Sequence, residues 1–287
     1  MFIPILISIL LLVLITLLLR RYRKNPEYKC FLLTLETSAD RRDKFLNHYD
    51  ESVPLEIIYG TDTRKLENAK KYQKIIDPSY YREALKLHYN ANKTRPDITY
   101  FNLGAIGCYM GHMDFYKRCF DKNLKYAVIF EDNVVIKDTC VYREIQSVID
   151  KKGDDFEMCF FHCLSRYPDE EKLVKDGLER VKWISSTKCY LIHVENMKKY
   201  YKHFFPIDNH IDMKHEDIIA RGARVYYKDL RHCLHIDRTH NSTIGHSNWG
   251  KRKFFSKRYP TATTDVLEYG WWLIPRYILR TKPTPIF

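Results

Sequence analysis

Three polar residues, Glu131, Asp132 and Asn133, directly follow the apolar and aromatic run 126–130. A run of this length and composition is typical of a strand that is buried on both faces. Carboxylates at the end of such a strand cost free energy unless a cation or a ligand donor compensates them. Because open α/β sheets bind ligands at the carboxyl ends of their strands, the pattern predicts an α/β fold with a binding site at this corner. An acidic turn that caps the next element is the alternative interpretation.

The rest of the chain alternates between strand-like and helix-like patterns. We expect further strands at 30–35, 55–59, 158–162, 188–192 and lastly 223–227, and helices near 38–49, 104–123, 141–151 and 194–203. Residues 63–98 are polar and mostly helical in pattern, which predicts an insertion beside the sheet, and 164–180 are expected to form a charged loop. The alternation favours a mostly parallel sheet that is covered by helices on both faces.

The N-terminal segment 2–19 carries no charge and is almost entirely aliphatic. Its length is close to the ~20 apolar residues that a helix needs to cross a bilayer. Because no charged segment precedes it and basic residues follow it, we predict an uncleaved transmembrane anchor at 1–19 rather than a signal peptide. A helix buried in a globular core is the alternative. The anchor is followed by a basic stem at 20–29, one domain at 30–250, and a basic aromatic tail at 251–287.

The net charge of +12 lies mainly at the two ends of the chain. Residues 20–29 contribute +4 and residues 251–287 contribute +6, which leaves +2 for 30–250. A nucleic-acid-binding domain would carry basic residues across one face, so this distribution argues against a nucleic-acid partner and favours anionic membrane lipids. The mixture of aromatic residues and arginine at 271–280 is typical of a bilayer interface, although a helix docked on the core has the same composition.

The orientation in the membrane is contested by two kinds of evidence. The basic cluster after the anchor favours a domain that faces the cytosol. The eight cysteines include no CxxC pair and several lie in apolar runs, so we expect neither a zinc site nor a disulfide framework, and unpaired thiols agree with the cytosol. The glycosylation sequons at Asn92 and Asn241 favour the luminal side instead. On balance we predict that the catalytic domain faces the cytosol, with the luminal side as the alternative.

Three segments in this order and spacing resemble glycosyltransferase family 25, which includes bacterial lipooligosaccharide galactosyltransferases and collagen galactosyltransferases. Residues 33–42 are similar to the family's first strand and its following D-R-R turn, and 104–112 are similar to its G-x-x-G-C-x-x-S-H helix. Residues 126–134 are similar to its strand that ends in E-D-D. Weaker similarities occur at 206–208 and 241–244.

The resemblance implies a GT-A-like nucleotide-sugar fold, a divalent metal that is usually Mn²⁺, and a UDP-sugar donor. It implies donor contacts from Thr34, Leu35, Arg41, Arg42, Gly60, Gly104, His112 and Asp132, and a metal held by Glu131, Asp132 and Asn133. The chemistry agrees with these residue types, because a cation with oxygen ligands neutralises the charge that grows on a departing diphosphate. A guanidinium fork also suits phosphate oxygens.

The sequence departs from the family pattern at two positions. Asn133 stands where a carboxylate is usual, so its amide oxygen can ligate a cation but brings no charge. Gly111 replaces the serine of the helix motif and removes a hydroxyl group near the donor. Either change is compatible with a different sugar, with weaker metal dependence or with lost activity.

An inverting transfer also needs a base that takes the proton of the acceptor hydroxyl. The resemblance points to Asp208, and Asp212, Glu216 and Asp217 compete with it. We therefore predict a membrane-anchored, metal-dependent, inverting glycosyltransferase that moves a hexose, galactose or glucose, to a glycan, lipid-linked saccharide or protein. A degenerate copy that binds a sugar nucleotide or glycan without turnover is the alternative. Phosphoryl transfer is disfavoured, because the chain contains no P-loop motif.

Overall fold

The computed structural model describes residues 27–89, 101–173, 177–237 and 239. Its strands are β1 (Tyr28–Leu35), β2 (Leu55–Gly60), β3 (Tyr126–Glu131), β4 (Val134–Ile136), β5 (Met158–Phe160), β6 (Ser165–Leu173), β7 (Leu178–Ser185), β8 (Cys189–His193), β9 (Val225–Lys228) and β10 (Leu234–Ile236). Its helices are α2 (Ala39–Leu46), α3 (Leu66–Lys70), η1 (Gln73–Ile75), α4 (Pro78–Tyr89), α5 (Leu103–Asp121), α6 (Cys140–Lys152), α7 (Val194–Lys198), η2 (Tyr201–Phe204) and α8 (Ile211–Ala220).

Eight of these strands form one mixed sheet in the order β2-β1-β3-β8-β5-β9-β7-β6. The pairs β1–β2, β1–β3 and β5–β9 are parallel, whereas β3–β8, β5–β8, β7–β9 and β6–β7 are antiparallel. The prediction of a mostly parallel sheet therefore holds for β2-β1-β3, which carries the candidate site, and for β5–β9. It does not hold for the rest, because β8 runs against both of its neighbours.

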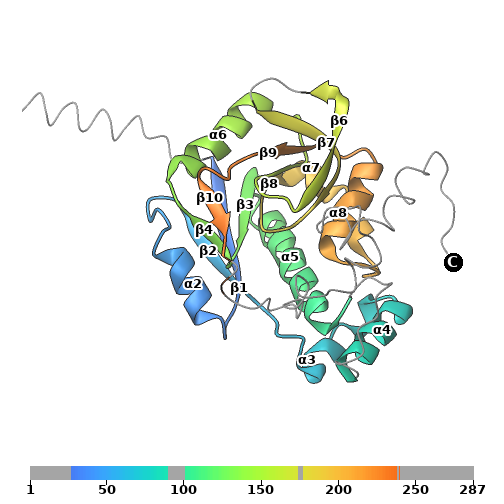
Figure 1. Cartoon of the computed structure of the whole chain (residues 1–287). Coiled ribbons are helices and arrows are strands. Elements are labelled where there is room, and N and C mark those ends of the chain that lie inside the picture. Colours follow the sequence, from blue (N-terminus) through green and yellow to red (C-terminus); the bar gives the residue numbers. More distant parts are fainter. Residues whose placement is uncertain (1–26, 90–100, 174–176, 238, 240–287) are drawn as a thin grey trace, which may run out of the picture.

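Both faces of the sheet are covered, as predicted. In β3, Ala127 and Ile129 belong to one apolar core, whereas Val128 and Phe130 belong to another. The first core contains residues of α5, α7 and α8, and the second contains residues of α2, α6, β4 and β10. Figure 1 shows α2 and α6 on one side of the sheet and α5 and α8 on the other. This arrangement explains why the strands are apolar at successive positions rather than at alternate ones.

Three predicted elements differ from the structure. The expected charged loop at 164–180 contains β6 and β7, which form a ribbon at the sheet edge, where a strand needs no continuous apolar run. Residues 223–227 are not the last strand, because β10 follows and pairs with β4. The helix expected at 194–203 is divided into α7 and η2.

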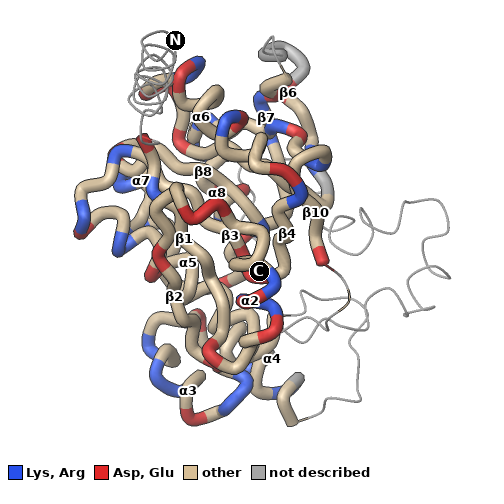
Figure 2. The backbone as a smooth tube through the Cα atoms, turned by 90° about the vertical axis from the view of Figure 1, so that its left-hand side faces the viewer, with Lys and Arg blue, Asp and Glu red and all other residues tan. Residues whose placement is uncertain are grey.

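Several predictions fall outside the described residues. They concern the anchor at 2–19, the stem up to residue 26, the sequons at Asn92 and Asn241, and the tail at 251–287. Among the helices that the structure describes, none combines the length and the apolar character that a membrane span requires. Figure 2 shows Lys and Arg interspersed with Asp and Glu in the described part of the chain.

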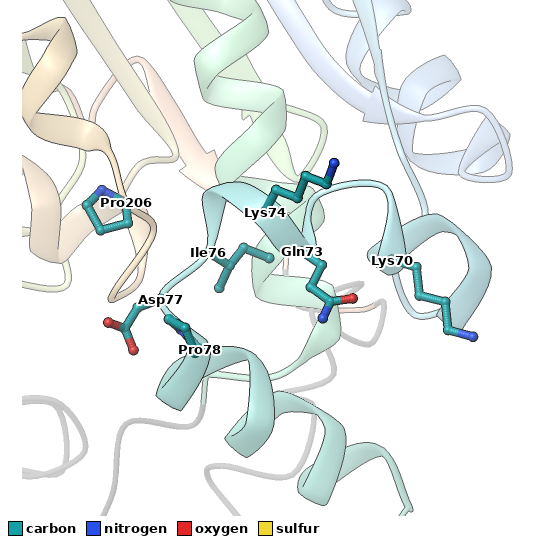
Figure 3. Close-up of a pocket in the computed structure, with 7 residues that line it drawn as sticks. All are labelled: Lys70, Gln73, Lys74, Ile76, Asp77, Pro78 and Pro206. Atoms are coloured by element: carbon teal, nitrogen blue, oxygen red, sulfur yellow. The ribbon is translucent and has the colours of Figure 1, made fainter.

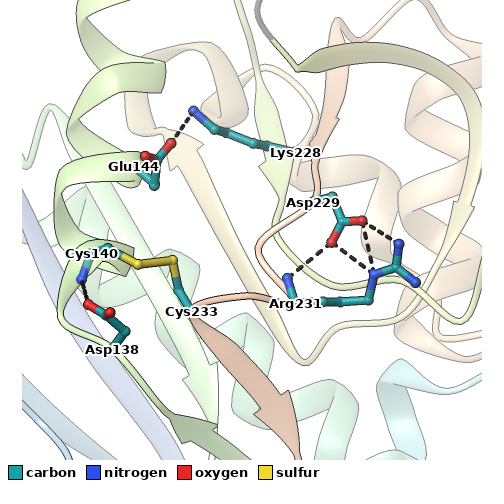
Figure 4. Close-up of a disulfide and its surroundings, with 7 residues drawn as sticks. All are labelled: Asp138, Cys140, Glu144, Lys228, Asp229, Arg231 and Cys233. Atoms are coloured by element: carbon teal, nitrogen blue, oxygen red, sulfur yellow. Dashed lines mark hydrogen bonds and ion pairs between the residues drawn. A yellow bond between two sulfur atoms is a disulfide. The ribbon is translucent and has the colours of Figure 1, made fainter.

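The expectation that all cysteines are unpaired is wrong. Cys140, at the start of α6, forms a disulfide with Cys233, just before β10 (Figure 4). The two residues are 93 positions apart in sequence, and the antiparallel pairing of β10 with β4 brings them together. The disulfide holds β10 beside β4, and the backbone N–H of Asp237 at the end of this ribbon donates to the Asn133 carbonyl at 2.7 Å. The argument for the cytosol from unpaired thiols therefore fails.

The disulfide predicts a specific thiol count. Alkylation of the denatured protein is expected to modify six cysteines before reduction and eight after it, as measured by intact mass. In Cys233→Ser the count is expected to be the same before and after reduction. Eight modified cysteines in unreduced wild-type protein would show that Cys140 and Cys233 are not joined.

Gly107 allows α5 to pack directly on the loop after β2. A Cβ atom at this position would lie 2.5 Å from the carbonyl oxygen of Thr61 and 2.6 Å from Oγ1 of Thr63. The first of these atoms belongs to the backbone, so it cannot move away without moving the loop.

We expect Gly107→Ala to lower the free energy of unfolding by about 1–3 kcal/mol, the usual cost of overpacking a buried contact. Urea denaturation followed by circular dichroism measures this change. Gly60→Ala is the matched control, because a Cβ atom there has its nearest neighbours at 3.6 Å, an ordinary contact distance. Equal stabilities of the two variants would contradict the close approach at Gly107.

Candidate active site

The carboxyl ends of β1, β2 and β3 meet at one edge of the sheet because these three strands are parallel. The register pairs Leu35 with Gly60 and Leu33 with Glu131. Thr34 lies between Leu33 and Leu35, so four residues from three strands, Thr34, Leu35, Gly60 and Glu131, share this edge. The sequence prediction placed the donor site at this edge, and the topology brings these four of the predicted residues together there.

Asp132 is buried and both of its carboxylate oxygens have partners. Thr34 Oγ1 donates to Oδ2 at 2.8 Å, and the Arg41 guanidinium forms an ion pair with Oδ1. The backbone N–H of Asp132 donates to the Leu33 carbonyl at 3.1 Å, which fixes the turn after β3. Burial raises the pKa of Asp132, and Arg41 and Thr34 offset this only in part. The contact with Arg41 joins the end of β3 to the first turns of α2.

Glu131 is also buried, and its carboxylate is paired with other groups than those that pair with Asp132. Lys188 Nζ lies 2.6 Å from its Oε2, Thr187 Oγ1 donates to its Oε1 at 2.6 Å, and His112 Nε2 lies 3.7 Å from Oε1. Burial acts to raise the pKa of Glu131, but Lys188 and His112 more than offset it and hold this pKa well below its usual range. Glu131 is therefore an anion in the folded protein.

Lys188 was not among the predicted site residues, and strand pairing explains its position. Strand β8 runs antiparallel to β3 with Phe130 opposite Cys189. The next backbone contact in this ladder is the Glu131 N–H, which donates to the Lys188 carbonyl at 2.8 Å. Cross-strand neighbours interact directly, so the lysine before β8 meets the glutamate that ends β3. The signal in the sequence was a lone lysine at the start of an apolar strand, and only the register assigns its partner.

His112 lies in the middle of α5 and is fully buried. Its Nδ1 lies 2.8 Å from the Tyr190 hydroxyl of β8, so the ring connects α5, β8 and Glu131. Its Nε2 atom, 3.7 Å from Glu131 Oε1, is buried without a hydrogen-bond partner in the described part of the chain. The predicted donor residue Gly104 lies in the first turn of the same helix, where the Asn102 side chain caps the N-terminus by accepting from Ala105 N–H at 2.9 Å.

Gly111, which departs from the family motif, lets α5 pack closely on β1. A Cβ atom at this position would lie 2.6 Å from Cδ1 of Leu33. A serine at 111 would therefore require the Leu33 side chain to move.

Two predicted residues do not join the corner that Glu131 and Asp132 form with Lys188 and Arg41. Arg42 lies over the Tyr59 ring, 5.8 Å from its centroid, and its Nε is 3.5 Å from the exposed Asp43 carboxylate. Asp208 is paired with Lys214 Nζ at 2.5 Å, and 43% of its side chain is exposed. Neither residue has a contact with Glu131 or Asp132 among the described interactions.

Asp212 is the acid from the α8 region that is electrostatically coupled to the corner. It lies in the first turn of α8, is 9% exposed, and interacts at longer range with Glu131 and Lys188. Burial raises the pKa of Asp212 to about 6, with a smaller contribution from Glu131. A carboxylate with this pKa is ionised at neutral pH and takes up a proton more readily than an ordinary aspartate does.

The three residues predicted to hold Mn²⁺ do not fit the ion as they are arranged. Manganese prefers several oxygen ligands with negative charge. The oxygens of Glu131 and Asp132 are already paired with Lys188 and Arg41, among others. The Asn133 Oδ1 atom is buried without a hydrogen-bond partner, but it is uncharged.

A second group of possible ligands, Cys108, His112 and Glu131, has its ligand atoms within 4.8 Å of one another. This set also suits manganese poorly, since a thiol is a soft ligand. Burial raises the pKa of the Cys108 thiol far above its usual value, which disfavours the thiolate that a metal would need.

Two cavities are formed by other parts of the described chain. One, of about 260 Å³, is lined by residues of β2 and α5 that include Gly60, Thr61 and Gly111. The other, of about 520 Å³, lies between η1, the start of α4 and Pro206, with Lys70, Gln73, Lys74 and Asp77 in its lining (Figure 3). Neither is lined by Glu131, Asp132 or Lys188, so the acidic corner is a separate feature.

Comparison with known sequences gives a family match over most of the described chain. Residues 27–215 match glycosyltransferase family 25 (LPS biosynthesis protein). Procollagen galactosyltransferase 2 of Mus musculus and of Homo sapiens are each 22% identical over 214 residues, which cover 70% of this chain and 33% of theirs. The chain thus spans about a third of the length of the curated relatives that it matches.

Comparison with solved structures gives only remote similarities. The crystal structure of A197 from STIV has a TM-score of 0.37 and 12% identity, and covers 70% of this chain and 81% of its own. UDP-glucose pyrophosphorylase complexed with UDP-glucose has a TM-score of 0.37 and 11% identity, with coverages of 70% and 90%. Both TM-scores are too low to support a conclusion about fold or ligand.

Proposed function

This chain belongs to glycosyltransferase family 25, and from that membership we propose that it transfers a hexose from a nucleotide sugar to an acceptor hydroxyl. The observation that carries the proposal is the corner at the ends of β1 and β3, where the buried acids Glu131 and Asp132 are flanked by Lys188 and Arg41. Charged donors around a strand end suit a diphosphate. We take the fold to be GT-A-like and the donor to be UDP-galactose or UDP-glucose, since the relatives are named galactosyltransferases.

The proposed reaction is a single displacement with inversion. The acceptor oxygen attacks the anomeric carbon, the bond from that carbon to the diphosphate oxygen breaks, and the bonding electrons leave with the nucleoside diphosphate. Asp212 receives the proton of the acceptor hydroxyl, in place of the Asp208 predicted from the sequence. The reasons are the burial of Asp212, its coupling to the corner and its pKa near 6. His112 lies beside Glu131 and is tied to Tyr190 of β8 through its Nδ1 atom.

The acceptor is proposed to be a glycan, a lipid-linked saccharide or a protein. Residues 2–19 are proposed to anchor the chain in the membrane from which it reaches this acceptor. The predicted lipid contacts of the stem and tail are part of this proposal. The Cys140–Cys233 disulfide supports an orientation toward the oxidising, luminal side, since such bonds persist in oxidising compartments. Glycosidase treatment of the expressed protein tests this orientation, and an unchanged mass would favour the cytosolic side.

The experiment that tests the function is a donor screen. The full chain in detergent is incubated with a panel of UDP-, GDP-, ADP- and CMP-sugars, with Mn²⁺ and with EDTA, and nucleotide release and thermal shift are measured. Family membership predicts a donor-dependent signal with at least one hexose nucleotide. The absence of any signal in both readouts would reject the transferase proposal.

The same screen evaluates a second candidate, a degenerate copy that binds the donor without turnover. The neutral Asn133 at a position where the family usually has a carboxylate favours it. A thermal shift with no release of nucleotide from any donor would support this candidate over the enzyme.

A further inference from the structure

The acidic corner contains two basic side chains in addition to its acids. Lys188 Nζ lies 2.6 Å from Glu131, and the Arg41 guanidinium is paired with Asp132. Because Glu131 and Asp132 are consecutive residues, the two cations are held at the same end of β3. Like charges are held together at a cost, and a protein that holds them together at a strand end presents a site for an anion.

The charges of the corner cancel. Glu131 and Asp132 contribute −2, Lys188 and Arg41 contribute +2, and Asn133 contributes nothing. A divalent-cation site needs an excess of negative charge, and the usual carboxylate at 133 would have supplied it. The replacement of that carboxylate and the presence of Lys188 therefore act in the same direction, toward a site that attracts an anion without first binding a metal.

Both basic groups retain donors for a ligand. The Lys188 ammonium has three N–H groups, and its hydrogen bond to Glu131 uses one of them. Its side chain is 23% exposed, so it can be reached from solvent. The Arg41 Nε atom is buried and has no hydrogen-bond partner in the described part of the chain. A buried donor of this kind is costly unless a ligand uses it.

We propose that Lys188 and Arg41 together neutralise the diphosphate of the donor, so that the transfer does not require a divalent metal. This inference rests on the proposed glycosyltransferase function and names the groups that replace the metal. As the bond between the sugar and the diphosphate breaks, the negative charge that grows on the leaving oxygen is stabilised by the Lys188 ammonium. Glu131 holds that ammonium in place, and Asp132 does the same for the Arg41 guanidinium.

The test uses the full chain after dialysis against EDTA, with its metal content checked by mass spectrometry. Transfer with the best donor of the screen is measured in EDTA and in Mn²⁺, and the affinities for UDP, GDP and ADP are measured by calorimetry in EDTA. We expect the wild-type rates in EDTA and in Mn²⁺ to agree within about twofold. Lys188→Met is expected to lower the rate by about 100-fold and to weaken nucleoside diphosphate binding by about tenfold or more.

The double variant Glu131→Gln/Lys188→Met distinguishes two roles of Lys188, which are contact with the diphosphate and neutralisation of Glu131. Lys188→Met alone leaves a buried carboxylate unpaired, which costs stability in any case. The double variant removes both charges, and it is expected to fold but still to bind nucleoside diphosphate weakly. Lys199→Met is the control, since Lys199 Nζ also pairs with a buried glutamate, Glu157, at 2.9 Å. Its rate and affinity are expected to be unchanged.

Two outcomes would overturn the inference and leave the proposed function intact. One is a wild-type rate that disappears in EDTA and returns with Mn²⁺. The other is a double variant that binds nucleoside diphosphate as tightly as the wild type, which would limit Lys188 to balancing Glu131. A wild-type protein that shows no donor-dependent signal with or without Mn²⁺ would instead reject the function, and the inference with it.

Discussion

Asp132→Ala is expected to lower the transfer rate by about 100-fold or more and to weaken nucleoside diphosphate binding. Asp132 accepts from Thr34 Oγ1 and pairs with Arg41, so its removal releases the guanidinium from the end of β3. A guanidinium that is no longer held by a carboxylate loses the fixed geometry on which bidentate phosphate binding depends. Single-turnover transfer and calorimetry with nucleoside diphosphate measure the two effects.

Part of any loss in Asp132→Ala will come from stability, because one partner of a buried ion pair has been removed. Such changes cost about 3–5 kcal/mol. Asp132→Asn therefore accompanies it, since an amide keeps the shape and an acceptor for Thr34 but not the charge for Arg41. Asp43→Ala is the control, because Asp43 is an exposed acid in the same helix as Arg41. If Asp132→Asn keeps wild-type rate and affinity while remaining folded, the corner is not the donor site.

The sequence was sufficient to predict the part of the fold on which the site is built. The apolar runs that became β1 and β3 are buried on both faces, and their carboxyl ends form the predicted edge. The β6–β7 ribbon was missed because β6, at the sheet edge, and β7, which is only partly buried, lack the continuous apolar pattern of the central strands. Sequence patterns report burial, so they identify central strands better than edge strands.

The pairings within the site were less predictable than its position. Lys188 meets Glu131 across an antiparallel register between segments 57 residues apart, and no local signal encodes that register. Cys140 and Cys233 are likewise joined by the pairing of two short strands. The sequence indicated that Gly111 is unusual but not that Leu33 fills the space. In each case the missing information is a contact between distant segments.

The choice between Asp208 and Asp212 leads to the second large expected effect. Asp212→Asn is expected to lower kcat by about 100-fold to 10,000-fold, the range for loss of a general base, with little change in nucleoside diphosphate affinity. Asp208→Asn is the matched control. Its carboxylate is paired with Lys214 and partly exposed, so we expect only a small change in kcat. Steady-state kinetics with both substrates varied separates the effect on kcat from the effect on KM.

The pH dependence provides an independent test of the same residue. Burial raises the pKa of Asp212 from 3.8 to about 6 in the folded protein. A base must be ionised to accept a proton, so wild-type kcat is expected to rise with pH through about 6 and then to level off. The residual rate of Asp212→Asn should lack this step.

As the pH rises, the free energy of unfolding is expected to fall while kcat rises, because the folded state binds the proton of Asp212 more tightly than the unfolded state does. The contribution of Asp212 to the free energy of unfolding is full below pH 3.8 and is lost as the pH rises through about 6. The free energy of unfolding of Asp212→Asn, relative to the wild type, should therefore increase between pH 4 and pH 6. A difference that stays constant over this range, together with an unchanged kcat profile, would return the role of base to Asp208 or to another acid of α8.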